Sequence, residues 1–314
     1  MYYLGVDIGG TAVKLGLVNE QGKIIVGSSA QLNFDHYQTP IMDTVLKSIH
    51  ELFEKTDEQA SDLAGIGVSA TGQIDTEHGT VIGGNIESWI GVNIKEIMES
   101  EFHCPVTVIN DANSMIIGEQ WIGAAKGIQN VIGITIGTGI GGGIIVDGKI
   151  LLGSRGIAGE LGHFMIMEDG IPCACGNAGC YERYAATTAL IRMVQEAYDD
   201  LNIKEPKEEI NGVVIFDYVR KGNPGVCAIL DEWMDHIAAG LISLVHIFNP
   251  SCIVIGGGVC RQEGFFMMPL KEKVLAGVMP CFREGLDIQS AVLKNDAGLI
   301  GAVYYTMLHG SNHK

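Results

Sequence analysis

The sequence predicts an α/β protein made of two domains of similar construction. Apolar runs typical of strands alternate with amphipathic helical patterns, and a chain of 314 residues more often forms two domains than one. A strand, a glycine-rich loop and a second strand at residues 3–18 recur at residues 133–146, which indicates an internal duplication. The residues that repeat at a constant offset of 128 are Gly5, Ile8 and Gly9, which match Gly133, Ile136 and Gly137.

The composition is that of a globular protein without a basic surface. A net charge of −17 argues against a nucleic-acid partner. No uncharged run free of glycine and proline reaches the roughly 20 residues of a membrane helix, and the N-terminus has no signal-peptide pattern, so we expect a cytoplasmic protein. The 43 glycines follow apolar segments in short runs, which is typical of ligand sites built from backbone N–H groups.

The N-terminal half begins with a hairpin. The strand Tyr3–Ile8 runs into the glycine loop Asp7–Thr11, and an apolar pattern resumes at Val13–Val18. A loop of this kind can aim backbone N–H groups at phosphates. The other elements predicted in this half are a helix at 39–54, a strand at 63–68, a hairpin at 73–82, a helix at 92–102, a strand at 106–109 and a helix at 114–124.

Asp111 follows a predicted strand and precedes a predicted helix. In α/β proteins, ligands meet side chains at the carboxyl ends of strands, so Asp111 is a candidate functional residue. An aspartate directly before a helix can also serve only as its N-cap. The sequence leaves both roles open.

The second glycine loop, Gly137–Gly142, also fits the pattern G-x-G-x-x-G of dinucleotide-binding proteins. That motif has to open a helix, whereas here an apolar strand and an Asp147-Gly148 turn follow, so we expect a second phosphate-binding hairpin. Helices are predicted at 184–198, 226–248 and 296–309, and a strand at 253–255. This strand opens into Gly256, Gly257 and Gly258, a turn that allows the close approach of a flat ligand such as adenine, or is an ordinary strand-to-helix turn.

A metal-binding loop is predicted at residues 160–182. His163, Cys173, Cys175 and Cys180 fall within eighteen residues and form the Cys₃His ligand set of a closed structural zinc site. The alternative is that they are buried cysteines and a packed histidine, which is uncommon for so many at such short range. Glu160 and Glu182 bracket the loop, and their carboxylates are natural acceptors for sugar hydroxyls.

These residues together resemble the ROK family (repressors, open reading frames and sugar kinases) along essentially the whole chain. The motifs that carry the resemblance are Asp7-Ile8-Gly9-Gly10-Thr11 with Lys14, Gly137-Thr138-Gly139-Ile140-Gly141-Gly142, Asn110-Asp111, and Glu160-Leu161-Gly162-His163 with Cys173, Cys175, Cys180 and Glu182. The resemblance implies an actin-like (ribonuclease H-like) duplicated α/β fold with a nucleotide and sugar cleft between two domains. It also implies a small domain of residues 1–112 with 296–314, and a large domain of residues 113–295.

The resemblance also implies roles for single residues. Asp111 would be the catalytic base, and Asp7 would help to hold Mg²⁺. The residues implied for the sugar are Gly72, Asn85, Asn110, Asp111, Glu160, His163 and Glu182. Those implied for ATP are Asp7, Gly9, Gly10, Thr11, Lys14, Gly137, Thr138 and Gly139, with Gly256, Gly257 and Gly258 near the adenine.

The implied reaction is transfer of the γ-phosphoryl group of ATP to the 6-hydroxyl of an aldohexose. Glucose is the first choice, with N-acetylmannosamine or a β-glucoside as alternatives. The cofactors would be ATP, Mg²⁺ and a structural Zn²⁺, and the chain would form a homodimer or homotetramer. A DNA-binding repressor is disfavoured because the first phosphate motif begins at Asp7 and leaves no room for a helix-turn-helix. A sugar sensor without catalysis is the alternative of another class.

Zinc loss has a further expected consequence. Glu160 and Glu182 flank the zinc loop, whereas the phosphate motifs lie outside residues 160–182. The sequence therefore predicts that loss of zinc weakens sugar binding and leaves the nucleotide affinity largely unchanged.

Overall fold

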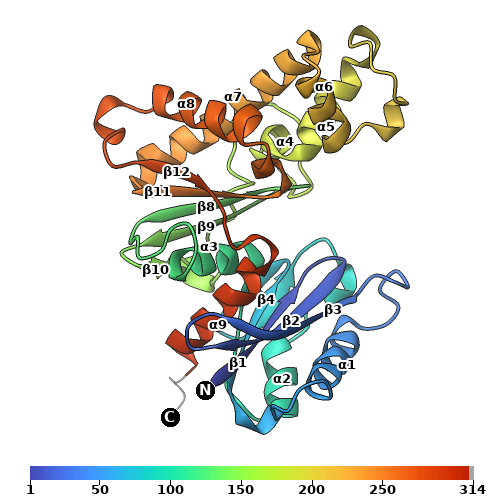
Figure 1. The fold of residues 1–314 in the computed structure, drawn as a ribbon, viewed down its shortest axis with the longest axis vertical. Helices are drawn as coiled ribbons and strands as arrows, with labels where there is room; N and C mark the ends of the chain where they lie inside the picture. Colours follow the sequence, from blue (N-terminus) through green and yellow to red (C-terminus); the bar gives the residue numbers. More distant parts are fainter. Residues whose placement is uncertain (311–314) are drawn as a thin grey trace. The chain divides into compact units, whose positions relative to one another are not determined.

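The computed structural model describes residues 1–310, and its chain divides into two compact α/β units (Figure 1). The first unit contains residues 1–129, residues 143–159 and the chain from Val292 onward. The second contains residues 130–142 and 160–291. The predicted α/β class is confirmed.

The first sheet has five strands in the order β3-β2-β1-β4-β7. Strands β1, β2 and β3 form an antiparallel meander, while β1, β4 and β7 run parallel. Their bounds are β1 Tyr2–Ile8, β2 Ala12–Asn19, β3 Ile24–Gln31, β4 Leu63–Ala70 and β7 Val106–Asn110. A separate hairpin of β5 (Gln73–Asp75) and β6 (Thr80–Gly83) lies where the sequence predicts one.

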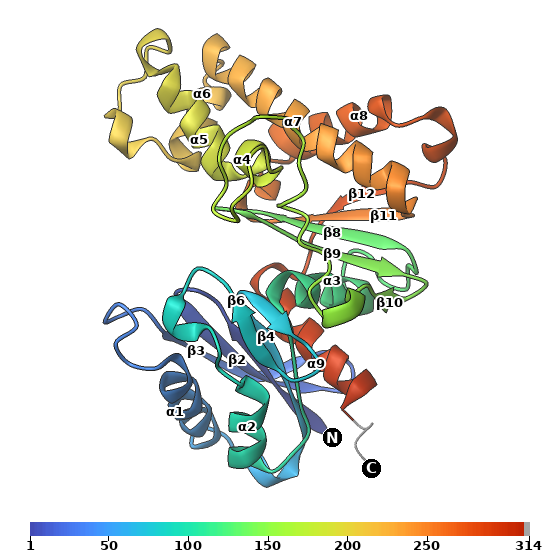
Figure 2. The ribbon, with the colours of Figure 1, turned by 180° about the vertical axis from the view of Figure 1, so that it is seen from behind.

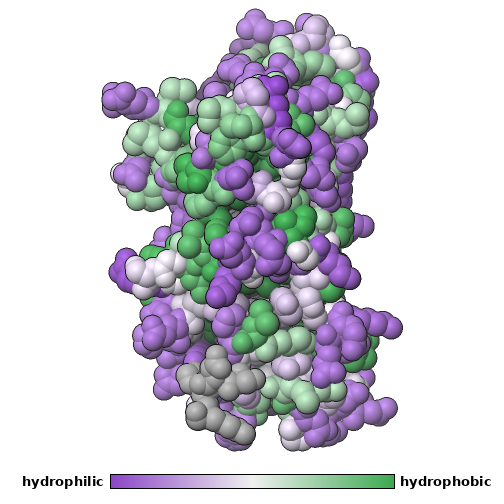
Figure 3. All heavy atoms as spheres, turned by 90° about the vertical axis from the view of Figure 1, so that its left-hand side faces the viewer, coloured by the Kyte–Doolittle hydropathy of each residue, from purple (hydrophilic) through white to green (hydrophobic). Residues whose placement is uncertain are grey.

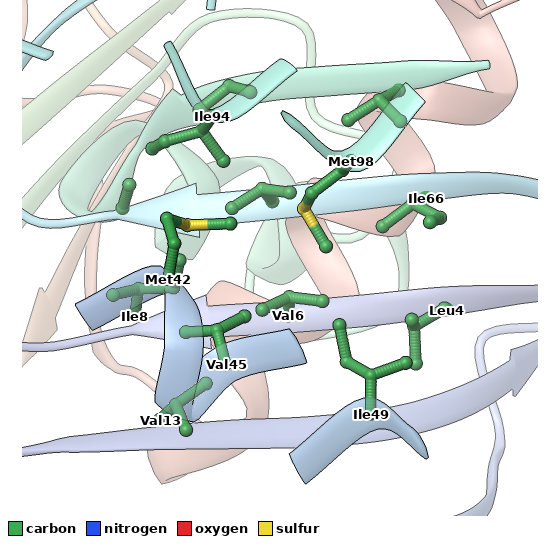
Figure 4. Close-up of a cluster of buried hydrophobic side chains, with 14 of the residues drawn as sticks. Leu4, Val6, Ile8, Val13, Met42, Val45, Ile49, Ile66, Ile94 and Met98 are labelled. Carbon is green, nitrogen blue, oxygen red and sulfur yellow. The ribbon is translucent and has the colours of Figure 1, made fainter. Parts of the chain in front are cut away.

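The two faces of β1 carry different side chains, as the period of two in a strand requires. Leu4, Val6 and Ile8 pack with side chains of α1 (Ile41–Phe53) and α2 (Ile94–Phe102) in a buried apolar cluster (Figure 4). The opposite face carries Gly5 where α9 (Ala297–His309) passes, and a Cβ at this position would lie 2.6 Å from Leu299 Cγ. Glycine therefore lets a helix pack directly on the sheet.

Helix α3 (Asp111–Trp121) packs against α9 through small residues. A Cβ at Gly118 would lie 2.5 Å from Ala297 O, and one at Gly301 would lie 1.7 Å from Ser114 O. This close contact groups α3 with the first compact unit, whereas the sequence places residues 113–129 and 143–159 in the large domain.

The second sheet has the order β10-β9-β8-β11-β12. The strands are β8 Val131–Ile136, β9 Ile140–Val146, β10 Lys149–Ile150, β11 Cys252–Gly256 and β12 Asp287–Ser290. As in the first sheet, one side of the sheet is antiparallel and the other is parallel. Strands β9 and β10 pair antiparallel, and β8, β11 and β12 run parallel. Each sheet thus has the same strand order, as an internal duplication requires.

The second unit also contains the helices α4 to α8 (Figure 2). Their bounds are α4 Glu182–Ala185, α5 Thr187–Glu196, α6 Gly212–Arg220, α7 Pro224–Phe248 and α8 Met268–Gly277. The single helix predicted at 184–198 is wrong in detail, because the chain leaves helical geometry at Ala186, with ψ of 159°. Helices α6 and α8 and strands β3 and β12 are not among the elements predicted from the sequence.

The surface mixes polar and apolar side chains, as one face shows in Figure 3. Within residues 1–310, none of the helices combines the length and hydropathy that crossing a membrane requires. The C-terminal residues 311–314, which the prediction assigned to the small domain, lie outside the described part.

Candidate functional site

The first glycine loop joins β1 to β2, as predicted. Gly9 N donates to Ala12 O at 3.0 Å and closes the turn, and the Tyr37 hydroxyl donates to Gly10 O. Thr11, at the end of the loop, is exposed. The loop therefore has an ordered backbone and an accessible edge.

Asp7 lies near the end of β1, beside Ser69 of the parallel strand β4. Ser69 Oγ donates to Asp7 Oδ1 at 2.6 Å. Burial of the carboxyl group raises the pKa of Asp7, although the bond from Ser69 and the charge of Lys14 act in the opposite direction. A carboxylate oxygen is a ligand that Mg²⁺ prefers, so Asp7 fits the predicted role.

Lys14 is paired with Asp7 in the register of β1 and β2. Its Nζ donates to Asn295 O at 2.9 Å and to the carboxylate of Asp296 at 3.3 Å. These contacts hold the ammonium group next to the start of α9, so a phosphate contact by Lys14 would compete with them.

Asn110, not Asp111, is the N-cap of α3. Asn110 Oδ1 accepts hydrogen bonds from Ala112 N at 3.0 Å and Asn113 N at 3.3 Å. Asp111 is the first helical residue, and its Oδ1 accepts from Ala112 N at 2.8 Å. The helix predicted from residue 114 thus begins three positions earlier, and the cap that the sequence could have assigned to Asp111 belongs to its neighbour.

Gly72 lies beside Asn110, whose Nδ2 donates to Gly72 O at 2.9 Å. Gly72 has φ of 100°, and a Cβ there would lie 2.6 Å from Gly83 O, so the position requires glycine. The indole of Trp89 donates to Thr71 O at 3.2 Å. The hydrogen bond from Asn110 therefore connects the end of β7 to the loop after β4. Asn85 is exposed in the loop after β6.

The four predicted metal ligands converge. One ligand atom from each of His163, Cys173, Cys175 and Cys180 lies within 4.8 Å of the others. His163 Nδ1 is 3.6 Å from Cys173 Sγ, and Cys175 Sγ is 3.5 Å from Cys180 Sγ. Zinc bonds of about 2.0–2.3 Å at tetrahedral angles separate ligand atoms by about 3.5–3.8 Å, so the donor set fits zinc.

The backbone of this loop is built for tight turns. Gly176 and Gly179 have φ of 93° and 75°, and a Cβ at Gly179 would lie 1.7 Å from Met167 O. Tyr181, directly after the last ligand, is fully buried, and its hydroxyl donates to Ile237 O of α7 at 2.8 Å. The loop is thereby anchored on the longest helix of the second unit.

Glu160 and Glu182 lie at the two ends of the loop. The pKa of Glu160 is raised by burial of its carboxyl group, which outweighs the nearby His163; the charge of Glu182 also raises it. Glu182 Oε2 accepts a hydrogen bond from Ile140 N at 2.9 Å. The sequence predicts a sugar ligand at Glu182, and the structure adds a contact with the second glycine loop.

The second glycine loop, with Gly137, Thr138 and Gly139, joins β8 to β9. It leads into a strand and not a helix, so the dinucleotide-binding interpretation is wrong, as expected from the sequence. Thr138 is exposed, and its carbonyl accepts from Thr188 Oγ1 at 2.8 Å. Thr188 has no signal in the sequence that separates it from other helical threonines.

The third glycine turn follows β11, and its residues have different surroundings. A Cβ at Gly257, which has φ of 109°, would lie 2.1 Å from Ile136 O, so this glycine is required by packing. Gly258 has no other atom within 4 Å of such a Cβ, which leaves space beside the backbone. Gly256 shows ordinary contacts. Space at Gly258 is compatible with a flat ligand.

Comparisons with known proteins assign the chain to a family. The sequence profile of the ROK family matches residues 3–307. A glucokinase of Thermotoga maritima is 33% identical over 306 residues, which cover 95% of each chain. A β-glucoside kinase of Listeria monocytogenes is 32% identical, with 98% of each chain covered.

A solved structure has the same fold. The ROK family glucokinase of Streptomyces griseus, in complex with glucose and AMPPNP, superimposes with a TM-score of 0.82 at 31% identity, covering 97% of this chain and 99% of that one. The predicted actin-like sugar kinase fold is confirmed. With the profile match and these relatives, the chain belongs to the ROK family and is a sugar kinase within it.

Proposed function

We propose that this chain transfers the γ-phosphoryl group of ATP to the 6-hydroxyl of an aldohexose, with glucose as the first candidate. The observation that carries the proposal is the capping of α3 by Asn110. Because the cap is provided by the neighbouring residue, an aspartate at position 111 is not needed to begin the helix. The similarity to the Thermotoga maritima glucokinase supports the choice of sugar.

Asp111 acts as the base in this proposal. The oxygen of the attacking hydroxyl bonds to the γ-phosphorus as the bond to the leaving β-phosphate oxygen breaks, and Asp111 accepts the hydroxyl proton late in this step. Phosphoryl transfer passes through a loose transition state, so the proton leaves late and a weakly basic carboxylate is sufficient. The main work of the protein is to align the groups and stabilise charge.

The phosphates are held by backbone N–H groups of Gly10, Thr11, Thr138 and Gly139 and by the Thr138 hydroxyl, while the N–H groups of Gly9 and Gly137 close the two loops. Asp7 would hold Mg²⁺ directly or through water, and the ion would neutralise charge on the phosphate oxygens. Lys14 contributes positive charge from the same hairpin. The turn Gly256–Gly258 leaves room for adenine.

The sugar is held by hydrogen bonds from Gly72, Asn85, Asn110, Glu160, His163 and Glu182. For His163 the geometry favours one assignment: its Nδ1 faces Cys173 Sγ and would bind zinc. The proton then resides on Nε2, which can donate to a sugar hydroxyl. Zinc would orient this ring and the two flanking carboxylates without taking part in the transfer.

A coupled assay of ADP release tests the proposal with glucose, N-acetylmannosamine and a β-glucoside as acceptors. We expect turnover with ATP and Mg²⁺, and the highest kcat/KM with glucose. A higher kcat/KM with either other sugar would change the assigned substrate, and the β-glucoside is included because of the Listeria monocytogenes relative. Sugar binding by calorimetry without turnover on any acceptor would instead indicate a sensor.

The oligomeric state stays a prediction. Light scattering coupled to gel filtration would distinguish the expected homodimer or homotetramer from a monomer of 33.6 kDa.

A further inference from the structure

The second glycine loop is held by the segment that directly follows the metal cluster. Ile140 N donates to Glu182 Oε2 at 2.9 Å. Thr187 N donates to Gly137 O at 2.9 Å, and Thr188 Oγ1 donates to Thr138 O at 2.8 Å. Both ends and the centre of the loop are thus bonded to residues 182–188.

These contacts leave little freedom for the loop. A Cβ at Gly139 would lie 2.4 Å from Glu182 Oε2, and one at Gly162 would lie 2.6 Å from Ile140 O. Glycine at position 139 leaves room for the Glu182 carboxylate, and glycine at position 162 lets the metal-binding loop approach the backbone of Ile140. A shift of either loop would therefore disturb the other.

Glu182 is itself fixed between two metal ligands. It is two positions after Cys180, and its N–H donates to Gly162 O at 2.9 Å, one position before His163. A bound metal would fix His163 and Cys180 relative to each other, and so would fix the backbone on both sides of this hydrogen bond. A bound metal would therefore also stabilise the position of Glu182.

The bond from Ile140 N also determines what Glu182 does for the nucleotide. A carboxylate repels phosphate, so Glu182 is not a phosphate ligand. By binding Ile140 N it instead helps to fix the end of the loop, whose first residues are held by the bond from Gly137 N to Gly139 O at 3.0 Å. A carboxylate can accept about four hydrogen bonds, so this role is compatible with a sugar contact through the same group.

We propose that Glu182 is a positioning residue for the second phosphate loop, and that through it zinc binding raises the affinity of the chain for ATP. The inference rests on the proposed function, in which the loop binds phosphate. It replaces the expectation from the sequence that nucleotide affinity is independent of zinc. An ordered loop binds phosphate more tightly because less conformational entropy is lost on binding.

The test is calorimetric titration of AMPPNP with Mg²⁺, without sugar, on four forms of the full chain. These are the zinc-loaded protein, the protein stripped with a chelator, and Glu182→Ala with and without zinc. Loss of a charge-assisted hydrogen bond predicts an affinity about tenfold lower for stripped protein and for loaded Glu182→Ala. In Glu182→Ala, removal of zinc should cause little further loss of AMPPNP affinity, because the hydrogen bond between Ile140 N and the Glu182 carboxylate is already absent.

The matched control is Glu168→Ala, which removes an exposed carboxylate from the same loop and should bind AMPPNP like the parent chain. Zinc content and circular dichroism are measured for every form. If stripped protein unfolds, the comparison of the loaded parent with loaded Glu182→Ala still tests whether Glu182 positions the phosphate loop. Equal affinity of the loaded parent and loaded Glu182→Ala would overturn the inference, whereas absence of AMPPNP binding by every form would overturn the proposed function.

Discussion

Ser69 Oγ lies 2.6 Å from Asp7 Oδ1, on neighbouring parallel strands of the first sheet. Ser69 is fully buried. Helix α9 passes over the pair at Gly298, where a Cβ would lie 2.9 Å from Asp7 Oδ1 and 3.0 Å from Ser69 Oγ. The hydroxyl and the glycine together fix the orientation of the carboxylate that we assign to Mg²⁺.

Replacing Ser69 with alanine should weaken the use of Mg²⁺. Without the hydroxyl, the Asp7 carboxylate loses its orienting donor, so we expect the Mg²⁺ concentration for half-maximal turnover to rise roughly three- to tenfold. The bond from Ser69 lowers a pKa that burial raises, so its loss should move the acidic limb of kcat/KM to higher pH. Ser29→Ala, on the exposed part of β3, is the control, and an unchanged Mg²⁺ dependence would contradict this role.

Replacing Asp111 with asparagine should reduce turnover by roughly 10² to 10⁴. Folding should be nearly unchanged, because Asn110 still caps α3. Steady-state kinetics and urea unfolding measure the two effects separately. Asn110→Ala provides the comparison for the cap and should cost about 1 kcal/mol of stability. Near-normal turnover of Asp111→Asn would show that another group accepts the proton.

The sequence predicts the repeated parts of the fold well. The matching residues around Gly5 and Gly133 indicate two parts of like construction, and the two five-stranded sheets have the same strand order. The metal cluster is also predictable, since its ligands are close in the chain. In contrast, the bonds Ser69–Asp7 and Ile140–Glu182 join residues 62 and 42 positions apart, and only the packed structure reveals them.

Replacing Gly67 with alanine should destabilise the first unit. A Cβ at this position would lie 2.3 Å from the Ala302 carbonyl oxygen of α9, and backbone cannot yield as a flexible side chain does. Overpacking of this kind costs about 1–3 kcal/mol, measurable by urea unfolding. Gly264→Ala is the control because nothing lies within 4 Å of its added Cβ. If Gly67→Ala and Gly264→Ala had the same free energy of unfolding, helix α9 would be able to shift away from the added Cβ without loss of stability.

Protein purified without added metal should contain about one equivalent of zinc, and Cys175→Ala should lose most of it, because three remaining ligands hold the ion less tightly. Elemental analysis measures both values. Stoichiometric zinc in Cys175→Ala would show that this thiol is not a ligand, and Cys104→Ala, outside the cluster, should keep its zinc.

The zinc site should also depend on pH in a defined direction. Burial raises the pKa of the Cys180 thiol to about 12, so in the metal-free loop this thiol keeps its proton at neutral pH. Zinc binds the thiolate and must release that proton, so affinity for zinc should rise with pH and fall on acidification. The metal-free chain should behave oppositely: its folded state favours the neutral thiol, so this contribution to stability is lost as pH rises above about 8.5, where cysteine ionises in the unfolded chain. Chelator competition measures how zinc affinity changes with pH, and thermal unfolding measures the stability of the metal-free chain. Zinc affinity independent of pH would show that zinc does not displace a proton from Cys180.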